Sequence, residues 1–204
     1  MQKKKRIIFF GDSITEFAVQ PQGYITKMQQ LLVKDKQENN YELAGAGVSS
    51  NKIYDLYLRM DDDVISKNPD VVVIFIGVND VWHKRSLGTG TDADKFERFY
   101  NAILKKLGEK NIKVIICTPA AIGERIDFSN ELDGDLNNYC NIVRHIAATH
   151  NVGLVDLRKA FTEYDRQHNP GNLPAGILTT DGVHLNEQGN EFVAEQMWQV
   201  ISKQ

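Results

Sequence analysis

The sequence predicts an α/β protein in which a parallel sheet is covered by helices on both faces. Five short apolar runs recur along the 204 residues, and segments with the period of an amphipathic helix separate them. The run VVVIFI at 71–76 is apolar at every position, as expected of a central strand that is buried on both sides. Strands that alternate with helices form right-handed crossovers within one sheet. We therefore expect a three-layer α/β/α sandwich with about five parallel strands in flavodoxin-like order.

Each element of this sandwich has its own sequence signal. The expected strands are residues 6–10, 41–44, 71–76, 113–117 and 152–157. Apolar stripes at helical spacing predict four helices, through Tyr24, Met28, Leu31 and Leu32; Phe96, Phe99, Ile103, Leu104 and Leu107; Leu136, Tyr139, Cys140, Val143, Ile146 and Ala147; and Phe192, Val193, Met197, Val200 and Ile201. Residues 77–92, 120–134 and 163–182 are irregular, and their length indicates functional loops. We expect one domain over 1–204.

Composition excludes several classes of partner. The 24 basic and 27 acidic residues give a net charge of −3, so the sequence predicts no nucleic-acid partner. No apolar run approaches the roughly 18 residues of a membrane span. The basic start MQKKKR is followed by only four apolar residues, too few for a signal peptide, which favours a cytoplasmic location.

Cys117 and Cys140, the only cysteines, are expected to be buried free thiols.

Residues that carry chemistry follow the ends of several expected strands. Gly-Asp-Ser at 11–13 follows the first strand, Gly-Ala-Gly at 45–47 follows the second, and Gly-Val-Asn-Asp at 77–80 follows the third. Asp-Gly-Val-His at 181–184 precedes the last helix. In an open parallel sheet, ligands bind beyond the carboxyl ends of the strands. We therefore expect these four segments to meet at one rim of the sheet.

Together these side chains fit acyl transfer by a serine. A serine hydroxyl needs a base that takes its proton, and an imidazole such as His184 does this near neutral pH. The imidazole needs a carboxylate that fixes its tautomer, and Asp181 lies three residues before it. The oxyanion of the intermediate needs hydrogen-bond donors. The backbone amides of Ser13 and Gly47 and the side chain of Asn79 are the expected donors.

Other interpretations of the same residues are weaker. Ser13 alone is equally explained as a helix cap. A dinucleotide-binding loop at 45–50 is disfavoured because Ser50 stands where that fingerprint has its third glycine. A metal-dependent hydrolase built on Asp12, Asp80 and His184 lacks the further histidines that such sites use. A non-catalytic binding module on the same fold is expected to have lost some of the catalytic groups, all of which are present here.

The order and spacing of the four segments closely resemble those of the SGNH hydrolases, also called GDSL-type esterases and lipases. The resemblance covers essentially the whole chain. It implies an α/β/α fold, a catalytic triad of Ser13, His184 and Asp181, and no metal or organic cofactor. Many family members have Asn-x-Gly-x-x-Gly in the second segment, where this chain has Gly45, Gly47 and Ser50. The geometry of that loop is therefore in question, although the oxyanion glycine is kept.

The expected activity is hydrolysis of a carboxylic ester through an acyl-enzyme. The three irregular stretches are mostly polar, which favours a small-molecule ester with a short acyl group, such as an O-acetyl group on a carbohydrate. Lysophospholipase or thioesterase activity is the alternative. Residues that follow the third and fourth strands are expected to line the substrate pocket: Trp82, His83, Thr118 and Pro119. The sequence does not indicate the oligomeric state.

Overall fold

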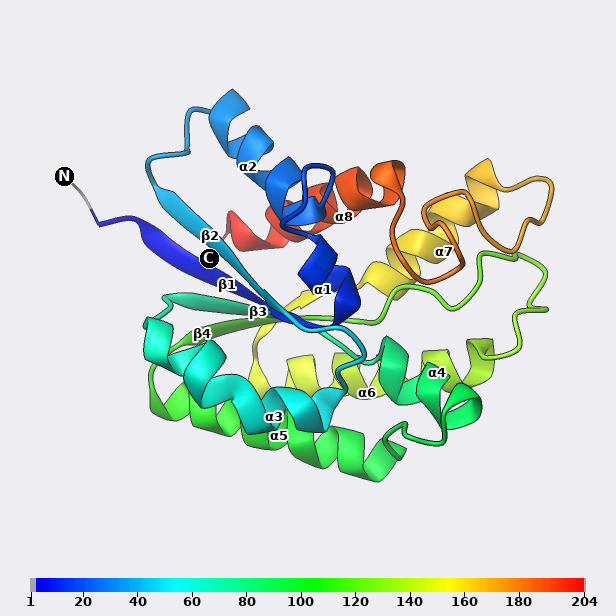
Figure 1. The fold of residues 1–204 in the computed structure, drawn as a ribbon, viewed down its shortest axis with the longest axis horizontal. Coiled ribbons are helices and arrows are strands. Elements are labelled where there is room, and N and C mark those ends of the chain that lie inside the picture. Colours follow the sequence, from blue (N-terminus) through cyan, green and yellow to red (C-terminus); the bar gives the residue numbers. More distant parts are fainter. Residues whose placement is uncertain (1–2, 204) are drawn as a thin grey trace.

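The computed structural model describes residues 3–203 and is built around a sheet of five parallel strands (Figure 1). The strands lie in the order β2-β1-β3-β4-β5, which is the flavodoxin-like order. Their bounds are β1 Lys5–Gly11, β2 Tyr41–Gly47, β3 Val71–Phe75, β4 Lys113–Cys117 and β5 Gly153–Val155. The predicted fold class and strand order are confirmed.

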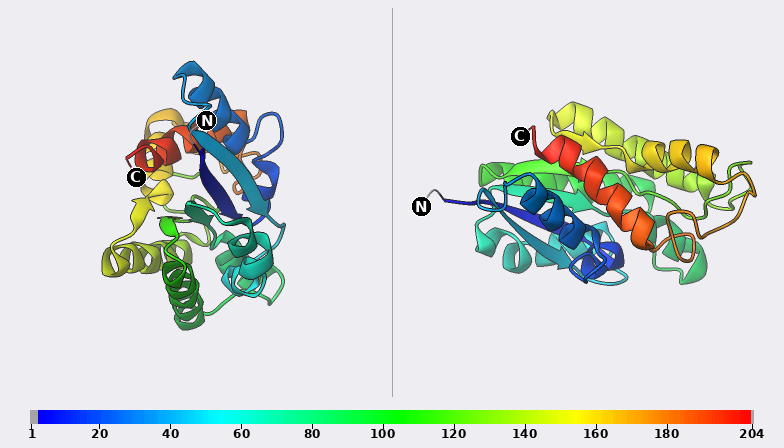
Figure 2. Two further views of the ribbon diagram at one scale, coloured as in Figure 1. Left: turned by 90° about the vertical axis from the view of Figure 1, so that its left-hand side faces the viewer. Right: turned by 90° about the horizontal axis from the view of Figure 1, so that it is seen from above.

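Helices cover both faces of the sheet (Figures 1 and 2). One layer holds α1 Ser13–Phe17, α2 Tyr24–Lys34, α7 Leu157–His168 and α8 Glu187–Ile201. The other holds α3 Ile53–Asp63, α4 Val78–Ser86, α5 Ala93–Glu109 and α6 Asp133–His150, with a short 3₁₀ turn at Ile65–Lys67. Alternate residues of each strand face opposite layers, because Ile7 and Phe9 join one apolar cluster and Ile8 and Phe10 join the other.

The register of the strands brings their carboxyl ends together. Gly11 at the end of β1 is paired with Gly47 at the end of β2 on one side and with Phe75 at the end of β3 on the other. The residues that follow these three positions therefore leave the sheet side by side. This is the rim at which the sequence predicts the site.

Four of the predicted boundaries differ from the structure. β2 extends through Gly47, three residues beyond the expected end at position 44, and β5 is shorter than the expected 152–157. Residues 77–92 were expected to be irregular, yet most of them form α4. The irregular stretch 163–182 begins inside α7, which continues to His168.

Other expectations about the buried parts of the chain are met. Both cysteines are buried and free.

Within residues 3–203, no helix has the length and apolar character needed to cross a membrane.

Arg59 of α3 connects the ends of the two strands that lead to the rim. Its Nη2 donates to the carbonyl oxygens of Gly11 and Ala46, at 2.8 and 3.0 Å. The guanidinium also donates to Asn51 and forms an ion pair with Asp63, and it lies 4.5 Å above the ring of Phe10. A planar group with several fixed donors is needed to make all of these bonds at once.

Arg59→Lys should therefore lower the free energy of unfolding by about 2–3 kcal/mol, because lysine cannot bond to both carbonyls and to Asn51 together. The measurement is urea denaturation followed by circular dichroism. Arg98→Lys on the exposed face of α5 is the matched control and should change stability by less than about 0.5 kcal/mol. Equal stabilities of the two variants would contradict this role of Arg59.

Candidate active site

Ser13 is the first residue of α1 and lies directly beyond β1. The carboxylate of Asp12 accepts a hydrogen bond from the backbone N–H of Ile14 at 3.0 Å, which caps the start of the helix. Ser13 is only 7% exposed. Its Oγ lies 3.0 Å from Nε2 of His184, although 171 positions separate the two residues in the chain. The structure thus brings together the serine and the histidine that the sequence pairs.

His184 is held by a tight turn that starts at Asp181. One oxygen of the Asp181 carboxylate accepts the backbone N–H of His184, and the other lies 2.7 Å from Nδ1 of its ring. Gly182 lies inside the turn at φ +93°, a backbone conformation that favours glycine. Burial alone would raise the pKa of Asp181, but the hydrogen bonds from His184 and Val183 hold that pKa below its ordinary value. The carboxylate is therefore ionised and positioned to orient the imidazole.

The remaining expected oxyanion donors lie on the neighbouring segments of the rim. Gly47 ends β2 so close to α1 that a Cβ atom there would lie 2.0 Å from the backbone nitrogen of Glu16. Only glycine allows this approach. Asn79 is in the first turn of α4 and is buried, and its Nδ2 donates to the carbonyl oxygen of Asn51 at 3.1 Å. That bond uses one of the two amide N–H groups and fixes the side chain against the loop after β2.

The loop after β2 departs from the usual family pattern, and the structure shows how it keeps its shape. Ser50, at the place of the third glycine, has φ +65°, so the left-handed conformation persists without glycine. The neighbouring Ser49 donates from both its backbone N–H and its hydroxyl to the carboxylate of Glu16. Gly45 lies inside β2, where a Cβ atom would lie 2.7 Å from the side chain of Val19. Polar contacts to α1 therefore hold the loop.

Two aromatic rings lie against His184. The ring centroid of Phe17 is 5.9 Å from that of the imidazole, and the centroid of Trp82 is 6.4 Å away. Trp82, one of the expected pocket residues, also contacts the ring of His83 at 5.6 Å. Phe17 was not expected from the sequence, where it reads as an ordinary helix residue.

The other two expected pocket residues are used elsewhere. Thr118 is fully buried, and its hydroxyl accepts the backbone N–H of Arg158 and donates to Asp156. Pro119 is also buried, and its carbonyl oxygen accepts from the thiol of Cys140. Within residues 3–203 neither residue forms a hydrogen bond with Ser13 or His184, and their place in the substrate pocket stays a prediction.

Lys52 and His83 are two enclosed polar side chains, and the charge of Lys52 acts on the His83 ring; sequence reasoning did not find this pair of residues as a unit. Lys52 is 6% exposed, and its ammonium donates to a single acceptor within residues 3–203, the carbonyl oxygen of Ser50. His83 lies one helical turn after Asn79 and is 7% exposed. Burial and the charge of Lys52 lower the pKa of His83, so the ring is neutral near pH 7.

The protonation pattern of His83 follows from its surroundings. Its Nδ1 is enclosed and has no hydrogen-bond partner within residues 3–203. An enclosed N–H group without an acceptor is rarer in proteins than an enclosed acceptor without a donor, so the proton belongs on Nε2. His83 is thus a neutral side chain with a free N–H donor, beside an ammonium that has unused donors.

Two carboxyl groups are buried beneath the site. Asp12 and Asp80 are almost completely enclosed, and burial raises the pKa of each to about 7. The negative charge of Asp80 raises the pKa of Asp12 further. Asp80 accepts from the backbone N–H of Ile53 and so ties the start of α3 to α4. Both carboxyls are used as hydrogen-bond acceptors of the framework.

These carboxyls should make the protein less stable as the pH rises from about 4 to about 7. The unfolded chain releases both protons near pH 3.8, whereas the folded chain keeps them to about pH 7. The folded state therefore binds more protons in this window, and its stability falls with rising pH. Asp80→Asn should flatten the curve of unfolding free energy against pH. The exposed Asp94→Asn is the control, and the same curve for both variants would contradict the assignment.

No group of three or more His, Cys, Asp or Glu side chains within residues 3–203 is arranged to hold a metal ion.

Comparison with known proteins identifies relatives along most of the chain. An acetyl xylan esterase of known structure, AlAXEase, is 62% identical, covers 96% of this chain and 99% of its own, and superposes with a TM-score of 0.95. The acetylxylan esterase of Geobacillus stearothermophilus is 29% identical over 93% of this chain and 90% of its own length. The human isoamyl acetate-hydrolyzing esterase 1 homolog is 25% identical over 97% of this chain and 82% of its own length.

The sequence model of the GDSL-like lipase/acylhydrolase family matches residues 9–192. The matched segment begins within β1 and ends within α8, and so contains every part of the site described above. The chain belongs to the GDSL-like lipase/acylhydrolase family and is an ester-cleaving hydrolase.

Proposed function

We propose that this protein removes O-acetyl groups from carbohydrates and that Ser13, His184 and Asp181 form its catalytic triad. The observation that carries the proposal is the continuous chain of contacts from Ser13 Oγ through the imidazole to the Asp181 carboxylate, at 3.0 and 2.7 Å. This is the geometry that a serine nucleophile and its general base require.

In the first half of the reaction, Ser13 Oγ attacks the acetyl carbonyl carbon and its proton moves to Nε2 of His184. The carbonyl π bond opens, and the oxyanion accepts hydrogen bonds from the backbone amides of Ser13 and Gly47 and from Nδ2 of Asn79. Collapse of this intermediate breaks the bond to the sugar oxygen, which leaves with the proton from Nε2. The ionised Asp181 stabilises the imidazolium meanwhile.

In the second half, water attacks the acetyl-serine. His184 takes a proton from the water, and the same donors stabilise the second oxyanion. Collapse releases acetate and returns the proton to Ser13 Oγ. In this proposed reaction every proton is transferred through Nε2 of one imidazole, so the reaction needs no metal or organic cofactor.

Three features support a sugar acetate as the substrate. The relatives are named for acetate esters: acetylated xylan in two cases and isoamyl acetate in another. The rings of Phe17 and Trp82 against His184 offer apolar faces to the C–H groups of a sugar. The unused donors of Lys52 and His83 suit the oxygens of a polyhydroxylated alcohol group better than they suit an acyl chain.

Ser13→Ala should reduce kcat on 4-nitrophenyl acetate by up to ~10⁶-fold in steady-state kinetics, because removal of the nucleophile disables the whole triad. A Ser13→Ala variant with a tenth of the normal kcat would rule out Ser13 as the nucleophile.

Asn79→Ala should lower kcat by roughly 10²–10³-fold with little change in KM, because its amide binds only the developing oxyanion. Steady-state kinetics on the same ester measure both constants.

His83→Leu should lower kcat/KM for an acetylated xylo-oligosaccharide by about tenfold, the loss expected for one hydrogen bond to a substrate group. On 4-nitrophenyl acetate, which offers no sugar oxygen, the change should stay within about twofold. Lys52→Met should behave in the same way, and His145→Leu on the exposed side of α6 is the matched control. Equal losses of kcat/KM on both esters would show that Lys52 and His83 stabilise the fold and do not bind the sugar.

A preference of the unaltered protein for 4-nitrophenyl octanoate over 4-nitrophenyl acetate would favour a lysophospholipase or thioesterase.

A further inference from the structure

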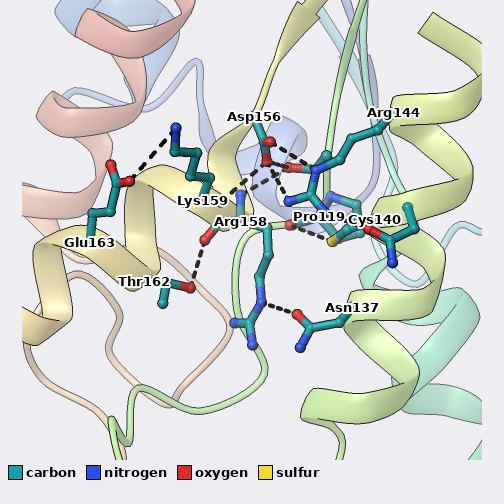
Figure 3. Close-up of polar contacts among 11 residues, drawn as sticks. Pro119, Asn137, Cys140, Arg144, Asp156, Arg158, Lys159, Thr162 and Glu163 are labelled. Carbon is teal, nitrogen blue, oxygen red and sulfur yellow. Dashed lines mark hydrogen bonds and ion pairs between the residues drawn. The ribbon is translucent and has the colours of Figure 1, made fainter. Parts of the chain in front are cut away.

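A cleft lies at the β5 edge of the sheet, and Ser13 is not among the residues that line it. Its walls are the loop at 123–130 and the facing sides of α6 and α7, and its volume is about 280 Å³. Figure 3 shows polar contacts among side chains of α6 and α7, several of which line this cleft. The cleft therefore opens on the same rim as the candidate active site, because all five strands are parallel.

Most charges on the walls are already paired. Arg144 makes a two-pronged pair with Asp156, with both N–O distances at 2.8 Å (Figure 3). Arg158 donates to Asp133 and Asn137 at 2.6 and 2.8 Å. These bonds hold α6 and α7 together and leave the arginines little freedom to bind anything else.

Two arginines of the cleft have no such partner. Arg125 of the loop and Arg166 of α7 both line the cleft. Neither guanidinium forms a hydrogen bond or an ion pair with any described residue, and both are exposed. The protein as a whole carries a net charge of −3, so an unneutralised pair of arginines on one cleft is a local excess of positive charge.

A buried carboxyl lines the same cleft as these arginines. Asp165 lines the cleft, is 6% exposed and has no hydrogen-bond or ion-pair partner among the described residues. Burial and the nearby Glu124 carboxylate raise its pKa to about 7. A buried polar group without a partner destabilises the folded state by about 1–3 kcal/mol, and a ligand hydroxyl would remove that penalty.

An aromatic ring stands at the mouth of the cleft. Phe128 is 77% exposed and has φ +65°, a conformation unusual for a bulky residue. Hydrogen bonds on both sides of Phe128 hold its loop. The Asp127 carboxylate accepts from Ser129 and from the side chain of Asn172. The side-chain oxygen of Asn172 accepts from the backbone N–H of Ile126. The ring is therefore presented to solvent by a fixed loop.

The cleft is also joined to the turn that carries the catalytic histidine. The backbone N–H of Gly123 donates to the carbonyl oxygen of Gly182 at 2.8 Å. The buried carboxylate of Glu124 accepts three backbone N–H groups, at residues 177–179, that lead into the same turn. A ligand that spans the rim would contact both places.

We propose that this cleft binds a sugar unit that carries a carboxylate, such as a uronic acid on the same acetylated polysaccharide that supplies the ester. Arg125 and Arg166 bind the carboxylate, Asp165 accepts from ring hydroxyls, and Phe128 covers the apolar face of the ring. The link to a polysaccharide rests on the proposed function, whereas binding itself does not require ester cleavage. Free phosphate shares the anionic charge but has neither vicinal hydroxyls nor an apolar face, so Asp165 and Phe128 favour the sugar.

Binding is measured by isothermal titration calorimetry at pH 8 with the Ser13→Ala protein, which separates it from catalysis. The probes are xylotetraose with one glucuronic acid branch, unbranched xylotetraose, and inorganic phosphate. The branched sugar should bind at least about tenfold more tightly than either of the others, as expected for one charge-assisted bidentate contact. Failure of the esterase assay would leave this result intact, so the two proposals fail separately.

Variants test each part of the cleft. Arg125→Ala with Arg166→Ala should abolish the preference for the branched sugar, whereas Arg98→Ala on α5 should keep it. Asp165→Asn should weaken the branched sugar by about threefold or more without weakening phosphate, because the change replaces one of the two acceptor oxygens by an NH2 donor and removes the negative charge that strengthens the hydrogen bonds from ring hydroxyls. Equal affinity for branched and unbranched sugar, a preference that survives the double variant, or phosphate bound as tightly as the branched sugar would each overturn the proposal.

Discussion

The active-site rim depends on one guanidinium that holds two strand ends together. Nη2 of Arg59 joins the carbonyl oxygens of Gly11 and Ala46, the residues two positions before Ser13 and one position before Gly47. Serine hydrolases need the nucleophile and the oxyanion donors fixed to within a fraction of an ångström, and in this chain the proposed nucleophile and donors follow different strands. A planar donor in the space between them sets the separation of the two segments. The close backbone contact of Gly47 with α1 then allows almost no further movement.

The buried polar groups around this rim show how function shapes the framework. Asp12, Asp80 and Asp165 are all enclosed carboxyls whose pKa is raised by burial, an arrangement that a purely structural domain would avoid. The first two have hydrogen-bond donors from the backbone and so position the starts of helices. Asp165 has no such donor within residues 3–203. The contrast distinguishes two carboxyls that stabilise helix starts from one that lines a cleft without a hydrogen-bond partner.

Much of the fold and of the candidate site was predictable, because the signals are local. The strand at 71–76 is apolar throughout, and the spacing of Asp181 and His184 alone indicates a turn that aims both side chains the same way. α4 was missed because its buried residues mix the polar Asn79, Asp80 and His83 with two valines, which weakens the periodic apolar signal. Lys52 was missed because lysine is ordinarily a surface residue and no pattern marks an enclosed one. That residues 1–204 form one domain stays a prediction.

The distance in sequence between Ser13 and His184 has a consequence for biosynthesis. Ser13 and His184, the proposed nucleophile and general base, are 171 positions apart, and the turn that carries His184 is followed by α8 as the last described helix. Chains emerge from the ribosome amino end first, so the nucleophile segment is made long before its base. A nascent chain can form β1, β2 and β3 and still have no imidazole beside the serine. Hydrolytic activity would therefore appear only in the last moments of synthesis, and no truncated product of translation would cleave esters in the cell.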